Sequence, residues 1–463
     1  MAFGLALRLH FYLSDLSMWH DEAALVLNVL HKDFLDLLGP LSFAEAAPPL
    51  FLWIERAFSL LFGESTYALR LIPFLASCGS LLIFLPVARS VLRPAMVPWA
   101  LLLLACSDHA LWHTCEAKPY AVDIFAGVVV LALYYGTASW TLGRRLLLLG
   151  FASPVLILLV YPGCFLCGGL LLAILPDVWR ARQFRGWLSY GLLVLVIFTA
   201  FGLLVTGPIR AQRCEAILAC WTNNFPDWER PRSVPAWTVM AFLELFRYCF
   251  EPIGQVLVPF ALAGAVHFWR RGMWPLLALL LVPILLPLGA AYLHAYPFGG
   301  SRVVVYLTPA LALLVAAGLP LSTGTSVSTG RLRAFCRAGV LVLPLVPLGW
   351  SIHRVLDPWK RADCAGAARY VASHHQPGDG IAANHWEYLY YFRRMGFGVC
   401  LLGQDTLSPQ GRLWIVATAT TAAERLEIVN HFAQQGWMVL EQREFNRTSV
   451  VLFSKCGRAP PSG

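Results

Sequence analysis

Charged residues are scarce in this chain. Asp, Glu, Lys and Arg make up 13% of its 463 residues, whereas an average soluble protein has about 25%. This shortage excludes an ordinary cytosolic enzyme. The 30 prolines exclude a coiled coil, and an aromatic content of 13% excludes a disordered chain. With 58% hydrophobic residues, the composition indicates a polytopic membrane protein.

The 12 cysteines are expected to act mostly as small buried hydrophobic residues, since several stand inside apolar runs. Cys214 and Cys220 are different, because they lie on a predicted external loop, where a disulfide between them is an open alternative.

Apolar runs of spanning length recur along the chain. A spanning helix needs about 20 mostly apolar residues, and it tolerates Pro and Gly. Such runs are predicted near residues 71–91, 95–108, 121–137, 146–161, 163–177, 187–206, 250–269, 273–293, 303–320 and 338–353. Segment 1–13 is short for a span and contains Arg8. Either its helix tilts while Arg8 snorkels, or the natural N-terminus lies upstream. The segment lacks the basic leader and cleavage site of a signal peptide.

Arginine clusters fall on alternate loops between these runs. They are Arg89 with Arg93, Arg144 with Arg145, Arg180 with Arg182 and Arg185, Arg270 with Arg271, and Arg331 with Arg333 and Arg337. Positively charged loops resist translocation, so these loops are expected to be cytoplasmic. The external side then holds loops 14–70, 108–120, 207–249 and 294–302. Together with the tail from about residue 354, which is also expected on the external side, these loops carry nearly all the acidic residues. Function is therefore expected on the external face.

The tail, from residue 354 onwards, alternates strand-like and helix-like segments. Strands are predicted at 379–382 and 413–417, helices at 386–393 and 422–435, and a hairpin at 438–453 around Asn446. No GxGxxG occurs there, so a nucleotide site is not expected. The predicted organisation is a transmembrane domain at 1–353 and a small external α/β domain at 354–463. The predicted fold class is an all-α transmembrane bundle of about 11 helices with that added domain.

The first external loop carries two adjacent acids, Asp21 and Glu22, after Trp19 and His20. The stretches around them are too short to span and suit helices that lie in the membrane interface. Acidic residues at this place either cap a solvated helix N-terminus or form a reaction centre.

In loop 207–249, three tryptophans either contact a substrate or lie at the membrane interface. They are Trp221, Trp228 and Trp237.

A second group of polar residues surrounds the start of the span near 121–137. Glu116 and Lys118 form either a surface ion pair or part of a site. A charge at the bilayer centre costs at least about 2.5–3.5 kcal/mol, so Asp123 is expected to face the bundle or a water-filled cavity.

Arg302 follows a Gly-Gly-Ser sequence directly before the span at 303–320. Glycines let backbone approach a ligand closely, and the guanidinium fork suits a phosphate. The alternative is an arginine that snorkels to the interface. Arg56 and Arg70 are weaker candidates of the same kind.

The order of these motifs resembles a known family. The motifs are Trp19-His20-Asp21-Glu22-Ala23, Ala47-Pro48-Pro49-Leu50, Glu116-Ala117-Lys118-Pro119-Tyr120 and Gly-Gly-Ser-Arg302. Over residues 14–320 they resemble the GT-C integral-membrane glycosyltransferases, in the bacterial branch near protein O-mannosyltransferases and lipid A aminoarabinose transferase. Many relatives have His before the double proline, where this chain has Ala47. A role of that His in donor or metal binding therefore does not carry over.

The resemblance implies an inverting glycosyltransferase. It would move a sugar from a polyprenyl phosphate to a lipid, glycan or protein acceptor at the external face of a bacterial inner membrane. Asp21 would be the base, and Glu22 would orient the acceptor or bind a metal. Lys118 and Arg302 would bind the donor phosphate.

The remaining motif residues complete the implied site. Glu116, Tyr120 and Asp123 would contact the substrate. No cofactor is certain, and a divalent cation held by His20, Asp21 and Glu22 is left open. No nucleic acid partner is expected. The alternatives are a transporter or lipid flippase, for which no inverted repeats are found, and a non-catalytic assembly subunit.

Overall fold

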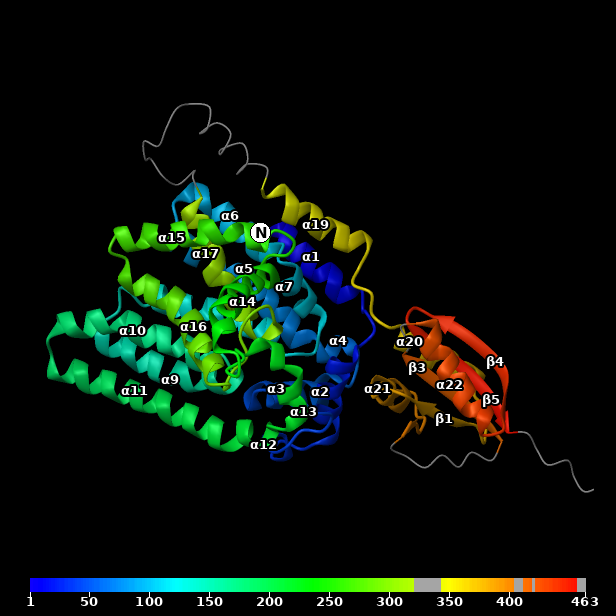
Figure 1. Cartoon of the computed structure of the whole chain (residues 1–463). Helices are drawn as coiled ribbons and strands as arrows, with labels where there is room; N and C mark the ends of the chain where they lie inside the picture. The colour runs from blue at the N-terminus through cyan, green and yellow to red at the C-terminus, as the bar shows by residue number, and fades with distance from the viewer. Residues whose placement is uncertain (320–342, 404–410, 419–420, 456–463) are drawn as a thin grey trace, which may run out of the picture.

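A computed structural model describes residues 1–319, 343–403, 411–418 and 421–455 (Figure 1). This part of the chain is mostly helical and has one five-stranded sheet near the C-terminus. The basic cluster of Arg331, Arg333 and Arg337 lies outside the described residues. So do the ends of two predicted spans, at 320 and at 338–342.

Five helical segments are long and apolar enough to cross a membrane. They are α5 (Leu71–Val91), α9 (Leu142–Leu159), α10 (Gly163–Ala181), α16 (Trp274–Tyr292) and the continuous segment Phe184–Gln212, which begins with α11 (Phe184–Leu204). Two bent helix pairs raise the number to seven within the described ranges. They are Pro94–Ala105 with Asp108–Cys115, bent by 56°, and Pro231–Cys249 with Gly254–Arg270, bent by 109°. The prediction of an integral membrane protein is supported, while the count of about 11 helices stays a prediction.

Shorter helices complete the helical part. They are α1 (Ala2–Leu13), α2 (His20–His31), η1 (Asp36–Leu38), α3 (Pro49–Phe62), α4 (Thr66–Leu69), η2 (Pro94–Met96), α6 (Val97–Ala105), α7 (Asp108–Trp112), η3 (His113–Cys115), α8 (Tyr120–Gly136), η4 (Val205–Ile209), α12 (Arg210–Gln212), α13 (Glu215–Cys220), η5 (Thr222–Asn224), η6 (Pro231–Ser233), α14 (Val234–Cys249), η7 (Gly254–Leu257), α15 (Val258–Arg270), η8 (Arg302–Leu307), α17 (Thr308–Gly318) and α19 (Leu345–Leu356).

Helices α15 and α17 pack closely because glycines lie at their contact. A Cβ atom added at Gly264 would lie 1.9 Å from the carbonyl oxygen of Leu314, and one at Gly318 would lie 1.9 Å from that of Phe260. Small residues commonly allow membrane helices to approach in this way.

Arg8 of α1 is buried and does not snorkel. Its Nε donates to Ser77 Oγ of α5 at 2.8 Å, and its Nη1 donates to the carbonyl oxygen of Ala105 at 3.1 Å. The snorkelling interpretation is therefore wrong, because polar groups on α5 and α6 satisfy the guanidinium inside the bundle.

The predicted cysteine burial holds for Cys106, Cys115, Cys167, Cys249 and Cys364.

The tail contains the predicted strands and helices, with boundaries shifted by a few residues. They are β1 (Gly380–Ala383), β3 (Arg412–Thr418), β4 (Trp437–Phe445), β5 (Thr448–Lys455), α21 (Glu387–Arg394) and α22 (Ala422–Gln434). The sheet order is β2-β1-β3-β5-β4, with β1 parallel to both of its neighbours and β5 antiparallel to both of its own. The sequence prediction missed α20 (Cys364–His374) and the two-residue strand β2 (Cys400–Leu401).

The tail docks on the N-terminal part of the chain, where α21 lies beside α2 (Figure 1). The backbone N–H of Met18 donates to Tyr391 Oη at 2.8 Å, and Trp386 Nε1 donates to the carbonyl oxygen of His20 at 2.5 Å. Apolar residues of α2, including Val26 and Leu27, share a core with α20 and α21. The tail therefore fixes the segment that leads into Asp21.

Candidate functional site

A cavity of about 500 Å³ lies where distant parts of the chain meet. Its walls come from the segment before α2, from α7 and η3, from the end of α13, from the end of α14 and the residues after it, from the start of η8, and from α19 and the segment that follows it. The lining residues are Trp19, Asp108, His109, Trp112, His113, Cys220, Trp221, Tyr248, Glu251, Ser301, Arg302, Arg354 and Trp359.

Arg302 lines this cavity, and Asp21, which is not among the lining residues, pairs with it. Asp21 lies in the first turn of α2, and its carboxylate forms an ion pair with the guanidinium of Arg302. The guanidinium also lies over the rings of Trp19, Tyr120 and Trp221, at 5.6, 5.7 and 5.4 Å from their centroids. Both charged side chains keep some exposure, 21% for Asp21 and 28% for Arg302. A ligand that enters the cavity can therefore reach Arg302, and Asp21 lies directly beside that guanidinium.

Glu22 points away from Arg302 and is completely buried. Its carboxylate accepts hydrogen bonds from Arg70 Nε at 2.6 Å, Arg70 Nη2 at 2.9 Å, Arg361 Nη1 at 3.2 Å and the backbone N–H of Ala117 at 2.9 Å. Both oxygens are thus occupied by the protein itself. Glu22 does not line the cavity and holds two buried cations in place.

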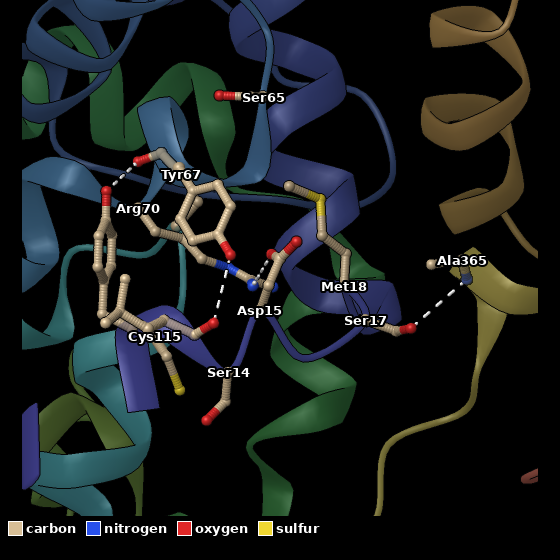
Figure 2. Close-up of polar contacts among 12 residues, drawn as sticks. Ser14, Asp15, Ser17, Met18, Ser65, Tyr67, Arg70, Cys115 and Ala365 are labelled. Carbon is tan, nitrogen blue, oxygen red and sulfur yellow. Dashed lines mark hydrogen bonds and ion pairs between the residues drawn. The ribbon is translucent and has the colours of Figure 1, made fainter. Parts of the chain in front are cut away.

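Arg70 and the segment before α2 form one connected network. Figure 2 shows Arg70 extending toward Asp15, at 3.3 Å, and Ser17 facing the backbone N–H of Ala365, at 3.4 Å. Arg70 is therefore committed to carboxylates of this chain, and the interpretation of Arg70 as a weaker phosphate-binding candidate is not favoured.

Lys118 is buried, and its ammonium is paired with the carboxylate of Glu45. The two residues before Glu45, Phe43 and Ala44, have φ angles of +65° and +49°. This left-handed region is unfavourable for residues with a Cβ atom. The alternative of a surface ion pair between Lys118 and Glu116 is wrong, because both are buried and each has another partner.

Glu116 begins a chain of hydrogen bonds that ends in the cavity. It accepts from Trp19 Nε1 at 2.7 Å, and its other oxygen lies 2.7 Å from His113 Nδ1. His113 Nε2 lies 3.0 Å from Tyr248 Oη. Burial raises the pKa of Glu116, but the hydrogen bond with His113 and the charges of His113, Arg361 and Lys118 outweigh it and lower the pKa to about 2. Glu116 is therefore a carboxylate that only accepts hydrogen bonds.

Tyr120 and Asp123 occupy the first turn of α8. The Tyr120 ring lies under the Arg302 guanidinium and 4.7 Å from the His113 ring centroid. Asp123 is buried in the bundle as expected, and its Oδ1 has no hydrogen-bond partner among the described residues. Asp123 does not line the cavity, whereas Tyr120 supports the cation that does.

Comparison with known proteins identifies the architecture. No family model matches the chain, and no curated protein matches its sequence. Solved structures do match. ArnT from Cupriavidus metallidurans bound to undecaprenyl phosphate has a TM-score of 0.54 and 13% identity, over 98% of this chain and 97% of that one. Its apo form gives 0.51 over the same shares. The chain has a GT-C fold.

A second GT-C structure supports this assignment. The apo oligosaccharyltransferase of Archaeoglobus fulgidus matches with a TM-score of 0.50 and 11% identity, over 87% of this chain and 64% of that one. The resemblance inferred from the motifs is therefore confirmed for the fold, and the fold extends over nearly the whole chain.

The glycines before Arg302 have a packing role in this GT-C structure. A Cβ atom at Gly300 would lie 2.9 Å from the Glu244 backbone oxygen, and Gly299 has φ +121°. They allow the loop to approach α14, and a close approach of their backbone to a ligand stays a prediction. Of the three tryptophans in the long loop, Trp221 lines the cavity, whereas Trp228 and Trp237 bond to backbone oxygens elsewhere.

The expected metal ligands do not converge. His20 Nε2 lies 3.8 Å from Asp21 Oδ1, but Glu22 is directed away. Elsewhere in the described chain, ligating atoms of Asp108, His109 and Glu251 lie within 4.8 Å of one another. A divalent cation in the site stays a prediction.

Cys214 and Cys220 are exposed free thiols, so the suggested disulfide is absent from the described structure.

Several site residues could not be recognised from the sequence. Tyr248, Glu251 and Arg361 lie in no motif, and Arg361 reaches the site from the connection between α19 and α20. His113 precedes Glu116 by three residues, and this spacing was the available sequence signal that the two side chains interact. Such spacing is common in any helix, so the signal alone was weak.

Proposed function

We propose that this chain is a membrane glycosyltransferase that takes a sugar from a polyprenyl phosphate and transfers it with inversion to a lipid, glycan or protein acceptor. We place the site at the external face of a bacterial inner membrane. The observation that carries the proposal is the Asp21–Arg302 pair at an aromatic cavity in a GT-C fold. The similar ArnT structure supports the donor class, because that protein was solved bound to undecaprenyl phosphate.

The donor phosphate binds Arg302 and Lys118. Each cation already has a carboxylate partner, Asp21 for Arg302 and Glu45 for Lys118. The phosphate therefore replaces these carboxylates, and guanidinium and ammonium groups bind it through charge-assisted hydrogen bonds. The isoprenoid stays in the bilayer, because each buried CH₂ contributes about 0.8 kcal/mol.

Exchange at Arg302 releases Asp21 to act as the base. The acceptor oxygen or nitrogen attacks the anomeric carbon while its proton moves to the Asp21 carboxylate. The bond from the anomeric carbon to the phosphate oxygen breaks, and its electron pair leaves with the polyprenyl phosphate. A single displacement of this kind inverts the anomeric configuration, by analogy with inverting glycosidases.

The other predicted residues act indirectly in this scheme. Tyr120 supports the Arg302 guanidinium, and Glu116 fixes Trp19. Glu22 orients the first turn of α2 through Arg70 and Arg361, so it is a positioning residue. Asp123 is buried in the bundle and is not paired with either cation, so it receives no role in this scheme.

The test is transfer of radiolabelled sugar from undecaprenyl-phosphate-linked donors to acceptors in an extract of bacterial envelope. Wild-type protein in detergent should transfer label, and Asp21→Asn should lower the rate about 10²–10⁴-fold, the usual contribution of a general base. Asp36→Asn, at an exposed acid on η1, is the matched control and should keep the wild-type rate. If Asp21→Asn retains the wild-type rate, the base assignment is wrong. Movement of labelled lipid across vesicles without transfer would favour the flippase alternative.

A further inference from the structure

We propose that the end of the cavity formed by His109, Tyr248 and Glu251 binds the sugar ring of the donor, with Tyr248 Oη as a hydrogen-bond acceptor. The proposal rests on the proposed function and adds the part of the site that reads the sugar. None of these three residues lies in one of the sequence motifs.

The position of the subsite follows from Arg302. The sugar is joined directly to the phosphate, so it occupies the cavity next to the cation that holds that phosphate. Arg302 and Tyr248 line the same cavity, whose walls also include Trp112, Trp221 and Trp359. Ligand pockets commonly combine such aromatic walls with a few fixed polar groups. The aromatic faces suit the C–H faces of a sugar, and the polar groups suit its hydroxyls.

The direction of each hydrogen bond follows from Glu116. This carboxylate only accepts, so the proton between it and His113 lies on Nδ1. In the neutral imidazole, Nε2 then carries the lone pair. In that tautomer Tyr248 donates its own proton to Nε2, across 3.0 Å. The lone pairs of Tyr248 Oη remain free to accept a hydrogen bond from a ligand in the cavity.

Two polar neighbours of Tyr248 line the same end of the cavity. The His109 ring stacks on the Tyr248 ring, with centroids 3.8 Å apart, and His109 Nδ1 is buried without a hydrogen-bond partner in the described part of the chain. Glu251 Oε2 lies 3.9 Å from that nitrogen. An ionised carboxylate accepts only. The ligand group that fits here offers hydrogen-bond donors, as sugar hydroxyls do.

The hydrogen bonds of Asp108 argue against a metal ion at this end of the cavity. Asp108 accepts from Arg354 Nε at 2.8 Å and Nη2 at 3.3 Å, and from Trp350 Nε1 and Trp359 Nε1, each at 3.1 Å. Its oxygens are fully used in fixing the cavity wall. That leaves His109 and Glu251 as free ligating groups, fewer than a closed metal site needs.

The experiment compares two probes on purified protein in detergent. One is undecaprenyl phosphate, and the other is undecaprenyl phosphate carrying glucose, mannose, galactose, N-acetylglucosamine or arabinose. At least one glycosylated probe should bind wild type more tightly than the bare lipid. Tyr248→Phe and Glu251→Gln should each weaken that probe about tenfold and change the affinity for bare lipid less than twofold. Tyr292→Phe, whose hydroxyl bonds to Thr238 outside the cavity lining, is the matched control.

His113 is tested as a positioning residue. His113→Gln should weaken the glycosylated probe as Tyr248→Phe does, and the double variant should be no worse than either single one, because both act through one hydrogen bond.

The outcomes separate the two proposals. If wild type binds neither probe, the proposed function fails. If wild type binds both, but Tyr248→Phe and Glu251→Gln weaken them equally or not at all, the sugar subsite is wrong. The subsite is also wrong if the effect of the sugar appears only with Mg²⁺ or Mn²⁺, or if no glycosylated probe binds more tightly than the bare lipid.

Discussion

Asp21 and Glu22 are adjacent in the sequence, yet they lie in two different environments. Asp21 is partly exposed and pairs with Arg302, a cation that lines the cavity, whereas Glu22 is completely buried between Arg70 and Arg361. Successive residues of a helix point about 100° apart, so one turn can serve a site on one side and a core on the other. The comparison separates a group that is free to react from a group that holds the framework.

The largest expected effect comes from removing the buried acid. Glu22→Ala should destabilise the folded protein by about 3–5 kcal/mol, because it leaves two buried guanidinium groups without their partner. Thermal unfolding in detergent measures this loss. Asp21→Asn, at a partly exposed pair, should change stability much less, and equal losses from the two variants would contradict the division between framework and site.

Removing the cation on the cavity side should affect binding more than folding. Arg302→Gln should weaken the affinity for undecaprenyl phosphate about 10–100-fold, the range for loss of a charged hydrogen bond. A fluorescent competitor or calorimetry in detergent gives the dissociation constant. Arg247→Gln, at an exposed pair with Glu244, is the control and should bind as wild type does. Equal weakening by both variants would show a general charge effect.

The second cation–carboxylate pair should show a smaller effect of opposite sign. Glu45→Gln should strengthen binding of undecaprenyl phosphate about fivefold, because Lys118 then loses the carboxylate that competes with the phosphate. Lys118→Gln should weaken binding. If Glu45→Gln weakens binding too, Glu45 is a structural partner of Lys118 and is not displaced by the donor.

The sequence predicted the helical membrane class and most of the tail, because both depend on local patterns. Long apolar runs indicated α5, α9, α10 and α16, and alternating residues indicated β3 and the final hairpin. Strand β2 was missed because two residues are too few to show alternation.

The site was predictable in part. Asp21 and Arg302 were found because each stands in a recognisable motif, and the fold brings them together across 281 positions of sequence. The partner of Lys118 was not predictable, because Glu45 lies in a separate loop with unusual backbone angles. The burial of Glu22 depends on Arg361, which arrives from near the tail. Such long-range pairings leave no periodic signal in the sequence.

The affinity of Asp21→Asn for undecaprenyl phosphate tests the central claim most directly. The claim is that the donor phosphate replaces Asp21 on Arg302. The neutral variant no longer competes for the guanidinium, so it should bind the lipid phosphate about fivefold more tightly than wild type, although it transfers sugar far more slowly. Affinity that stays unchanged or falls would contradict the claim and would place the phosphate elsewhere.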